Sequence, residues 1–306
     1  MPTLAHRLEY YAMRATIQAL RALTWNAAAS IGESLGRLGY RPLGIRKRVV
    51  EKQIAAAFPD LPTSKVKELS LAAYAHLGRT FVETALLDTL GKRGLIDLIE
   101  TVEGWELIDE VMSQGKGAVM VTGHIGNWEL AGAYVAARGV PLDAIARGMA
   151  NPLFDAFINH TREEMGMTIV HDSEAVRRTP RSLRAGRAVA FVADQGVLGL
   201  ASTFVPFFGR PAKTPRGAAV FALRFDVPVL FVVALRQPNG RFRIVVERIE
   251  AEDTGDRDRD VDRIVARFTE HLEKWVRVVP EQYFWQHRRW KRQPPDTPPA
   301  LRDPSA

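Results

Sequence analysis

The sequence predicts an α/β fold in which a mixed, mostly parallel sheet is flanked by helices and preceded by a helical segment. From residue 117 onward, short apolar runs alternate with longer segments whose apolar residues recur at helical spacing. The run 188–192 is apolar throughout, which is typical of strands covered on both faces and therefore of parallel pairing. Between the last two apolar runs, Pro238-Asn239-Gly240 favours a hairpin and hence one antiparallel pair.

Length and composition limit the chemistry that the chain can perform. Its 306 residues suffice for one large α/β domain with a helical appendage, and 46% hydrophobic and 25% charged residues are ordinary for a globular protein. Because the sequence has no cysteine, it has no disulfide, thiol nucleophile or cysteine-ligated metal. The sequence also lacks His-Glu-x-x-His, Gly-x-Ser-x-Gly and phosphate-loop patterns. We therefore expect no metal site, and hydrolases that use a serine nucleophile or cleave nucleotides are disfavoured.

The N-terminal part is expected to be helical and basic. Residues 1–60 carry nine Lys or Arg side chains against four carboxylates. In a helix over 3–35, Arg7, Arg14 and Arg21 recur every seven residues and so lie near one face. This pattern fits a helix lying on an anionic membrane surface, or a helix packed on its own domain with a solvated arginine face. No apolar stretch reaches the ~18 residues of a membrane span, and arginines interrupt any cleavable signal pattern.

The remaining elements follow in order. Two more helices are expected at 46–58 and 63–90, and then the alternating part begins. Its strands are expected at 117–122, 142–146, 167–170, 187–193, 228–234 and 241–248, and its helices at 127–138, 152–165, 173–185, 214–225 and 257–277. The predicted organisation is therefore membrane-associating amphipathic helices over 1–103, an α/β domain over 104–293, and a proline-rich, disordered tail over 294–306.

His124 is the first candidate for chemistry. It lies in a glycine-flanked turn after the strand at 117–122, and Glu129 lies on the first turn of the next helix. A carboxylate that accepts the Nδ1 proton of this histidine would fix its tautomer and raise the basicity of Nε2, as in a general base. The alternative is a histidine in a polar turn and a glutamate favoured by the helix dipole.

Two further strand ends carry polar side chains. Arg147 follows the second predicted strand and Asp194 follows the fourth. Since ligands in such sheets bind beyond the carboxyl ends of the strands, a base, a cation and an acid are expected at one edge. A buried structural role for Asp194 remains an equal alternative.

Residues 194–217 are expected to form a long loop rich in phenylalanine and glycine. Phe204, Phe207 and Phe208 in such a loop indicate an apolar ligand or a membrane face, unless the loop folds back onto the core. Thr214 is expected to cap the next helix, with Pro215 at its first position.

Residues 283–292 interleave aromatic and basic side chains. This composition fits a nucleic-acid surface, a membrane interface, or aromatics that dock the chain end on the sheet. Basic residues at the sheet edge are too few for a duplex groove, so we expect no nucleic-acid partner.

Four motifs fit one family in combination. They are His124-Ile125-Gly126-Asn127-Trp128-Glu129, a His-x4-Glu pattern; Arg147 with Asn151-Pro152 and Arg162-Glu163-x-x-Gly166; Asp194-Gln195 with Val205-Pro206-Phe207-Phe208-Gly209 and Thr214-x-x-Gly217; and Pro280-Glu281-Gln282-Tyr283-x-Trp285-x-His287-Arg288-Arg289. Over about residues 7 to 293, the chain resembles the bacterial lipid A biosynthesis acyltransferases of the lauroyl and myristoyl type, within the lysophospholipid acyltransferase superfamily.

The resemblance implies a glycerol-3-phosphate acyltransferase-like fold and a peripheral or monotopic protein on the cytoplasmic face of the inner membrane. It implies transfer of an acyl group from an acyl-carrier protein or coenzyme A thioester, with no other cofactor, to a hydroxyl of a membrane glycolipid. A lipid A precursor is the leading acceptor, an acylated mannoside or an aminolipid is the alternative, and a thioester hydrolase is a further rival.

The resemblance also assigns roles to residues. His124 would be the base and Glu129 its partner. The expected substrate-binding residues are Asn127, Arg147, Arg162, Glu163, Asp194, Phe204, Phe207, Phe208, Gly209 and Thr214.

Overall fold

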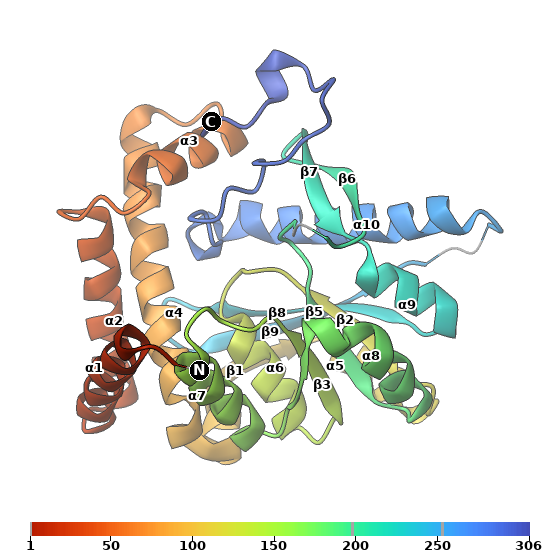
Figure 1. The fold of residues 1–306 in the computed structure, drawn as a ribbon, viewed down its shortest axis with the longest axis horizontal. Coiled ribbons are helices and arrows are strands. Elements are labelled where there is room, and N and C mark those ends of the chain that lie inside the picture. The colour runs from red at the N-terminus through yellow and green to blue at the C-terminus, as the bar shows by residue number, and fades with distance from the viewer. Residues whose placement is uncertain (1, 197–198, 252–253) are drawn as a thin grey trace.

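The computed structural model describes residues 2–196, 199–251 and 254–306 and consists of one large sheet, a separate hairpin and surrounding helices (Figure 1). Seven strands form the large sheet in the order β1-β9-β8-β2-β5-β3-β4. Within this sheet, as far as the described residues show, only β8 and β9 pair antiparallel, so the predicted mixed, mostly parallel sheet is confirmed. The strands are β1 Ile99–Glu103, β2 Ala118–Thr122, β3 Leu142–Ala146, β4 Thr168–His171, β5 Ala188–Val192, β8 Val229–Arg236 and β9 Phe242–Ile249.

Both faces of the sheet are covered. Along β2, Ala118 and Met120 belong to one hydrophobic core, and Val119 and Val121 belong to the other, as the two-residue period of a strand requires. The helices α5 (Trp105–Ser113) and α6 (Trp128–Ala137) cover the first face. The helices α8 (Ala175–Arg184), α9 (Gly217–Phe225) and α10 (Arg257–Val278) cover the second, and Figure 1 shows α6 and α10 on opposite sides of the sheet.

The N-terminal helices gather at one side of the sheet (Figure 1). They are α1 Leu4–Arg21, α2 Trp25–Tyr40, α3 Lys47–Ala57 and α4 Thr63–Asp97. Together with α7 (Pro152–Glu164), α1 and α4 enclose a third apolar cluster that contains Ile17, Leu86 and Phe157. No helix in the described residues is both long enough and apolar enough to span a membrane.

Close backbone contact joins α2 to α4. A Cβ added at Gly36 would lie 2.0 Å from the carbonyl oxygen of Tyr74, and one added at Gly78 would lie 2.2 Å from that of Gly32. Because no side chain larger than hydrogen fits at these crossings, the glycines set the distance between the two helices.

The segment after β5 differs from the predicted loop. It contains an antiparallel hairpin, β6 (Ser202–Phe207) and β7 (Arg210–Pro215), joined by a two-residue turn at Phe208 and Gly209. Both turn residues have positive φ, 50° and 69°, as a type I′ hairpin turn requires. The prediction for Thr214 was wrong as well, because Thr214 lies in β7 and α9 begins only at Gly217.

Two of the predicted segment boundaries also need correction. Residues 99–103 form β1 and pair with β9, so the sheet begins within the segment that we had assigned to the N-terminal helices. The tail 294–306 was predicted to be disordered, but it packs against the protein. Thr297 is buried, Arg288 forms an ion pair with Asp303, and Arg210 donates to the carbonyl of Ala300 at 2.9 Å.

Candidate active site

The turn between β2 and α6 holds His124 in a defined position. Gly126 has a φ of 59°, and a Cβ there would lie 2.0 Å from the carbonyl oxygen of Ala234 in β8. Its N–H donates to the carbonyl of Gln282, and the N–H of Phe284 donates to the carbonyl of His124, each at 2.9 Å. The turn is thus fixed by β8 and by the chain that follows α10, and only glycine fits at position 126.

Asp194 is the carboxylate that contacts the imidazole of His124. Its Oδ1 lies 2.6 Å from Nδ1 of His124, and its Oδ2 accepts the backbone N–H of His124 at 3.1 Å. The parallel register explains this contact. Thr122 of β2 pairs with Val192 of β5, so the residues two positions further along each chain lie level with one another.

The charge of Asp194 suits this contact. Its side chain is buried, and burial raises the pKa. The charge and the hydrogen bonds of His124, together with the charge of Arg289, outweigh that effect and lower the pKa to about 2. Asp194 is therefore ionised at neutral pH. An ionised carboxylate at Nδ1 favours the tautomer that carries its proton there and leaves Nε2 to accept a proton.

The surroundings of His124 leave Nε2 free. Among the described residues, no side chain or backbone group forms a hydrogen bond to Nε2, and 21% of the side chain is exposed. The ring of Trp128 packs edge-on at 4.9 Å between centroids, and Phe284 lies at 5.8 Å. A base whose proton-accepting atom is free and whose ring is held by aromatic side chains can take a proton from a substrate hydroxyl.

Glu129 does not contact His124 as the sequence had predicted. Its carboxylate forms a two-point ion pair with Arg162 of α7, with Nε–Oε2 at 2.8 Å and Nη2–Oε1 at 2.6 Å, and it accepts Trp128 Nε1–H at 3.2 Å. Burial raises the pKa of Glu129, but Arg162 more than offsets this and lowers the pKa. His124 precedes the helix, so the five-residue spacing did not determine which way Glu129 points. Glu129 supports the site through Trp128, whose ring packs on that of His124.

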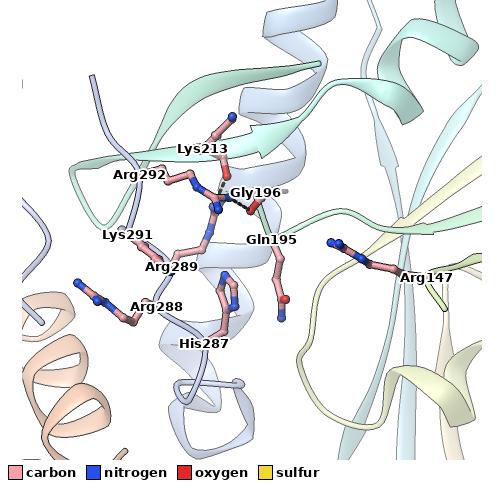
Figure 2. Close-up of a pocket in the computed structure, with 9 residues that line it drawn as sticks. All are labelled: Arg147, Gln195, Gly196, Lys213, His287, Arg288, Arg289, Lys291 and Arg292. Carbon is pink, nitrogen blue, oxygen red and sulfur yellow. Dashed lines mark hydrogen bonds between the residues drawn. The ribbon is translucent and has the colours of Figure 1, made fainter. Parts of the chain in front are cut away.

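Arg147 lies beyond the end of β3 with its side chain exposed, as expected. It lines a pocket of about 240 Å³ together with residues of β7 and of the C-terminal segment (Figure 2). Gln195 lines the same pocket, and its Nε2 is 3.1 Å from Nδ1 of His124. The pocket therefore adjoins the His124–Asp194 pair.

Two of the expected substrate-binding residues are fully buried and hold the fold together instead. Asn127 caps α6 by accepting the N–H of Leu130 at 3.0 Å, and its Nδ2 donates to Glu83 at 3.1 Å. Thr214 accepts a hydrogen bond from Nη2 of Arg289 at 2.6 Å. Neither side chain has exposed surface with which to contact a ligand in this structure.

Of the three phenylalanines of the hairpin, two are buried and one is exposed. Phe207 and Phe208 are buried in the core, where both contact the aromatic residues of the segment 283–290. Phe204 is 43% exposed and Glu163 is exposed on α7, so their substrate-binding roles stay predictions. Gly209 forms the hairpin turn and has no neighbour within 4 Å of an added Cβ.

A buried polar network behind the turn was missed by sequence reasoning. Glu83 of α4 forms an ion pair with Arg236 at the end of β8 and accepts a hydrogen bond from Asn127. His76 of α4 has its Nε2 3.1 Å from the carbonyl oxygen of Gly126. These residues come from distant parts of the sequence. His76 and Glu83 lie in a helix whose apolar spacing predicts only packing, so no local pattern identified them.

Arg289 belongs to the C-terminal motif but was not predicted as a site residue. It is buried, it donates to the carbonyl of Lys213 at 2.6 Å, and its charge acts on Asp194. Burial lowers the pKa of Arg289, partly offset by Tyr283 and Asp194. The Tyr-x-Trp-x-His-Arg-Arg spacing was the available signal, but its basic residues were considered only as part of a nucleic-acid or membrane surface, and docking on the sheet was considered for the aromatics alone.

Comparison with known proteins places the chain among acyltransferases. Over 270 residues it is 25% identical to the lipid A biosynthesis lauroyltransferase of Escherichia coli strain K12, covering 88% of this chain and 86% of that protein. It is 24% identical to the lipid A biosynthesis palmitoleoyltransferase of the same strain, covering 86% and 85%. It is 27% identical to the phosphatidylinositol mannoside acyltransferase of Mycobacterium tuberculosis, covering 59% and 58%. The family model for bacterial lipid A biosynthesis acyltransferases matches residues 2–292, and the chain therefore belongs to that family.

Proposed function

We propose that the protein transfers a fatty acyl group from a thioester donor to a hydroxyl of a membrane glycolipid, with His124 as the general base. The observation that best supports this proposal is the contact between His124 and Asp194, which holds Nδ1 and leaves Nε2 of His124 free at a strand end. Family membership supports an acyl donor and a lipid acceptor. The acceptor that we propose is a lipid A precursor, with an acylated mannoside as the second candidate because of the mannoside acyltransferases among the relatives.

In the proposed reaction His124 first accepts a proton from the acceptor and then donates it to the leaving group. Nε2 of His124 accepts the proton of the acceptor hydroxyl as its oxygen attacks the thioester carbonyl carbon. The tetrahedral intermediate collapses with cleavage of the carbon–sulfur bond, and the imidazolium returns the proton to the thiolate. Asp194 stabilises the imidazolium, as a buried carboxylate does in a catalytic triad.

Two kinds of hydrogen-bond donor are available to stabilise the negatively charged oxygen of the tetrahedral intermediate. The first backbone N–H groups of α6, at Trp128 and Glu129, lie at a helix N-terminus, where such groups have no intrahelical partner. Arg147 is a cation at the same sheet edge and is the alternative. Both can act without a metal ion.

We also propose that the protein works at the cytoplasmic face of the inner membrane, peripherally bound through its N-terminal helices. On α1, Leu4, Leu8 and Tyr11 are exposed by 74%, 64% and 67% at helical spacing, and Arg7 and Arg14 are exposed beside them. An exposed apolar stripe bordered by arginines fits the interface of an anionic bilayer.

The test compares two variants with the wild type, each assayed with an acyl-carrier thioester and a lipid A precursor. Turnover is expected to be abolished in His124→Ala and to fall by about 10²- to 10⁴-fold in Asp194→Asn, which keeps the shape but removes the charge at Nδ1. Wild-type turnover in His124→Ala would rule the mechanism out.

A second set of reactions separates transfer from hydrolysis and compares acceptors. Thioester consumption that proceeds equally without any lipid would indicate a hydrolase. Faster turnover with a phosphatidylinositol mannoside than with the lipid A precursor would favour the second acceptor. Replacing the acyl-carrier thioester by the coenzyme A thioester identifies the donor.

A further inference from the structure

The pocket beside His124 is walled almost entirely by positive charge. Its lining residues come from the end of β3, the chain after β5, β7 and the segment after α10. Figure 2 shows Arg147 on one side and the other labelled residues grouped opposite it, with Arg288 pointing outward. None of them is acidic. The cations are Arg147, Lys213, Arg288, Arg289, Lys291 and Arg292.

Most of this charge is not neutralised within the protein. Of these six cations, Arg288 alone forms an ion pair with a carboxylate in the described residues, that of Asp303. Arg292 donates to the carbonyl of Gly196 at 3.0 Å, and in the described residues the guanidinium of Arg289 donates only to uncharged oxygens of β7. Within the described part of the chain, the side chains of Arg147, Lys213 and Lys291 have no hydrogen-bond or ion-pair partner.

Arg289 gives the strongest indication that a ligand is missing. Its side chain is 3% exposed, and its Nε is buried without a hydrogen-bond partner among the described residues. A buried guanidinium without an ion-pair partner is costly, and the charge of Asp194, whose carboxylate is engaged by His124, offsets only part of that cost. Clustering further cations around it raises that cost, because like charges repel. An anion in the pocket would reduce both the cost of burying Arg289 and the repulsion between the cations.

The donor groups indicate which anion fits. Guanidinium forks and ammonium groups together match the several oxygens and the double charge of a phosphate. Gln195 connects this pocket to the chemistry, since its side chain lines the pocket and its Nε2 lies 3.1 Å from Nδ1 of His124. A phosphate held here therefore belongs to a molecule whose neighbouring atoms reach the base.

We infer that this pocket binds a phosphate or diphosphate group of one of the two substrates and so places the reacting group at His124. The inference rests on the proposed acyl transfer. Two sources share the chemistry. One is the phosphate of the pantetheine arm that carries the thioester, and the other is a phosphate on the lipid acceptor.

Binding measurements with inorganic pyrophosphate test the site without turnover. The test variant is the double substitution Lys213→Gln and Lys291→Gln, whose side chains have no partner to lose in the described structure. The matched control is Lys92→Gln with Lys116→Gln, which removes the same charge at the opposite edge of the sheet, where Lys92 adjoins Gly166 before β4 and Lys116 precedes β2.

Titration calorimetry should show saturable pyrophosphate binding that weakens about tenfold or more in the test variant, from the loss of two charge-assisted contacts. The control should bind like wild type, and circular dichroism checks that both variants are folded. Absent binding to wild type, or equal binding to wild type and the test variant, would overturn the site.

Paired probes then identify the source. Tighter binding of 4′-phosphopantetheine than of pantetheine assigns the site to the donor. Tighter binding of dihexanoyl phosphatidate than of dihexanoylglycerol assigns it to the acceptor. If neither phosphate improves binding, the inference fails.

The two proposals can fail separately. His124→Ala should bind pyrophosphate as tightly as wild type although its turnover is lost. Pyrophosphate binding in a wild-type protein that transfers no acyl group would retain the site and reject the proposed function. Acyl transfer by a wild-type protein that does not bind pyrophosphate would retain the proposed function and reject the phosphate site.

Discussion

At the scale of single residues, the site uses two carboxylates for two different tasks. Asp194 faces the imidazole of His124, whereas Glu129 is occupied by Arg162 and reaches His124 only through Trp128. A carboxylate that is already held by a guanidinium at two points is a poor partner for a developing imidazolium, because its lone pairs and charge are engaged. Glu129 therefore acts as a positioning residue in our mechanism.

This division predicts a double-mutant result. Glu129→Gln should destabilise the protein by up to about 3 kcal/mol, because it leaves the partly buried guanidinium of Arg162 without its ion-pair partner. Adding Arg162→Met should restore part of that loss, since no unpaired charge remains. Urea unfolding of the two single variants and the double variant measures the coupling. Additive losses would show that the two side chains do not depend on each other.

Sequence reasoning predicted His124 as the base, but the carboxylate that contacts it in the structure is not the predicted Glu129. His124 could be predicted because a glycine-flanked turn after a buried strand exposes whatever side chain it carries. The carboxylate at Nδ1 comes from a neighbouring strand about 70 residues away. If the order of the strands had been known, the pairing of Thr122 with Val192 would have placed Asp194 beside His124. That order is a property of the folded sheet, and local spacing does not contain it.

At the scale of elements, glycines determine how α2 meets α4. The helix α2 offers two glycines for comparison, Gly36 at the crossing and Gly39 three residues later. An added Cβ at Gly36 would lie 2.0 Å from a backbone oxygen, whereas one at Gly39 would lie 3.5 Å from the ring of Tyr74, an ordinary contact.

We therefore expect Gly36→Ala to destabilise the protein by about 2 kcal/mol or more, as overpacking against rigid backbone does. Gly39→Ala should be neutral or stabilising by up to about 1 kcal/mol, because alanine is the better helix former. Thermal unfolding of both variants measures the difference. Equal melting temperatures would mean that the helices separate easily at this crossing.

The exposed face of α1 gives a second prediction at this scale. Leu4→Glu combined with Leu8→Glu should weaken binding to vesicles that contain anionic lipid, since it removes apolar area and adds negative charge. Val176→Glu on α8 changes an equally exposed apolar side chain on another element and serves as the control. Vesicle flotation measures both. Unchanged flotation of the α1 variant would exclude this helix as the membrane contact.

The hairpin β6–β7 shows why one element escaped prediction. Hairpin turns of type I′ are usually recognised by Asn-Gly or Asp-Gly, but here the turn is Phe208-Gly209. Phe208 accepts a positive φ because its ring is buried against Phe58 and Trp285, both distant in the sequence. Tertiary packing thus outweighs the local preference. By contrast, the strands of the main sheet other than β1 have apolar runs, and their ends were predicted to within two residues. The strand β1, Ile99–Glu103, carries three polar residues and was not predicted.

At the scale of the whole molecule, buried polar groups connect the N-terminal helices to the site. Glu83 of α4 reaches Arg236 at the end of β8, and His76 of α4 reaches Gly126 in the turn that carries His124. From the other side, Gln53 of α3 donates to the carbonyls of Trp285 and His287 at 2.7 and 2.8 Å. The helices that we propose to bind the membrane therefore support the same turn and C-terminal segment that hold His124 and the basic pocket.

This connection makes the stability of the fold sensitive to acid in a defined pH window. Burial lowers the pKa of His76 from 6.5 to about 3, with Arg236 acting in the same direction. Below pH 6.5 the unfolded chain therefore binds a proton that the folded protein does not. The free energy of unfolding should fall as the pH decreases from about 6.5 towards 3, by up to about 1.4 kcal/mol per pH unit for this residue.

His287 adds to this effect, because burial lowers its pKa to about 4. Replacing His76 by Gln, which keeps a hydrogen-bond donor near the carbonyl of Gly126, should make the free energy of unfolding decline less steeply between pH 6.5 and pH 4. His160→Gln provides the control, because His160 is 65% exposed on the surface of α7. Urea unfolding of the three proteins at a series of pH values measures the slopes. If His76→Gln kept the wild-type slope, the acid sensitivity would arise elsewhere, and α4 would not be coupled to the turn that carries His124 through this histidine.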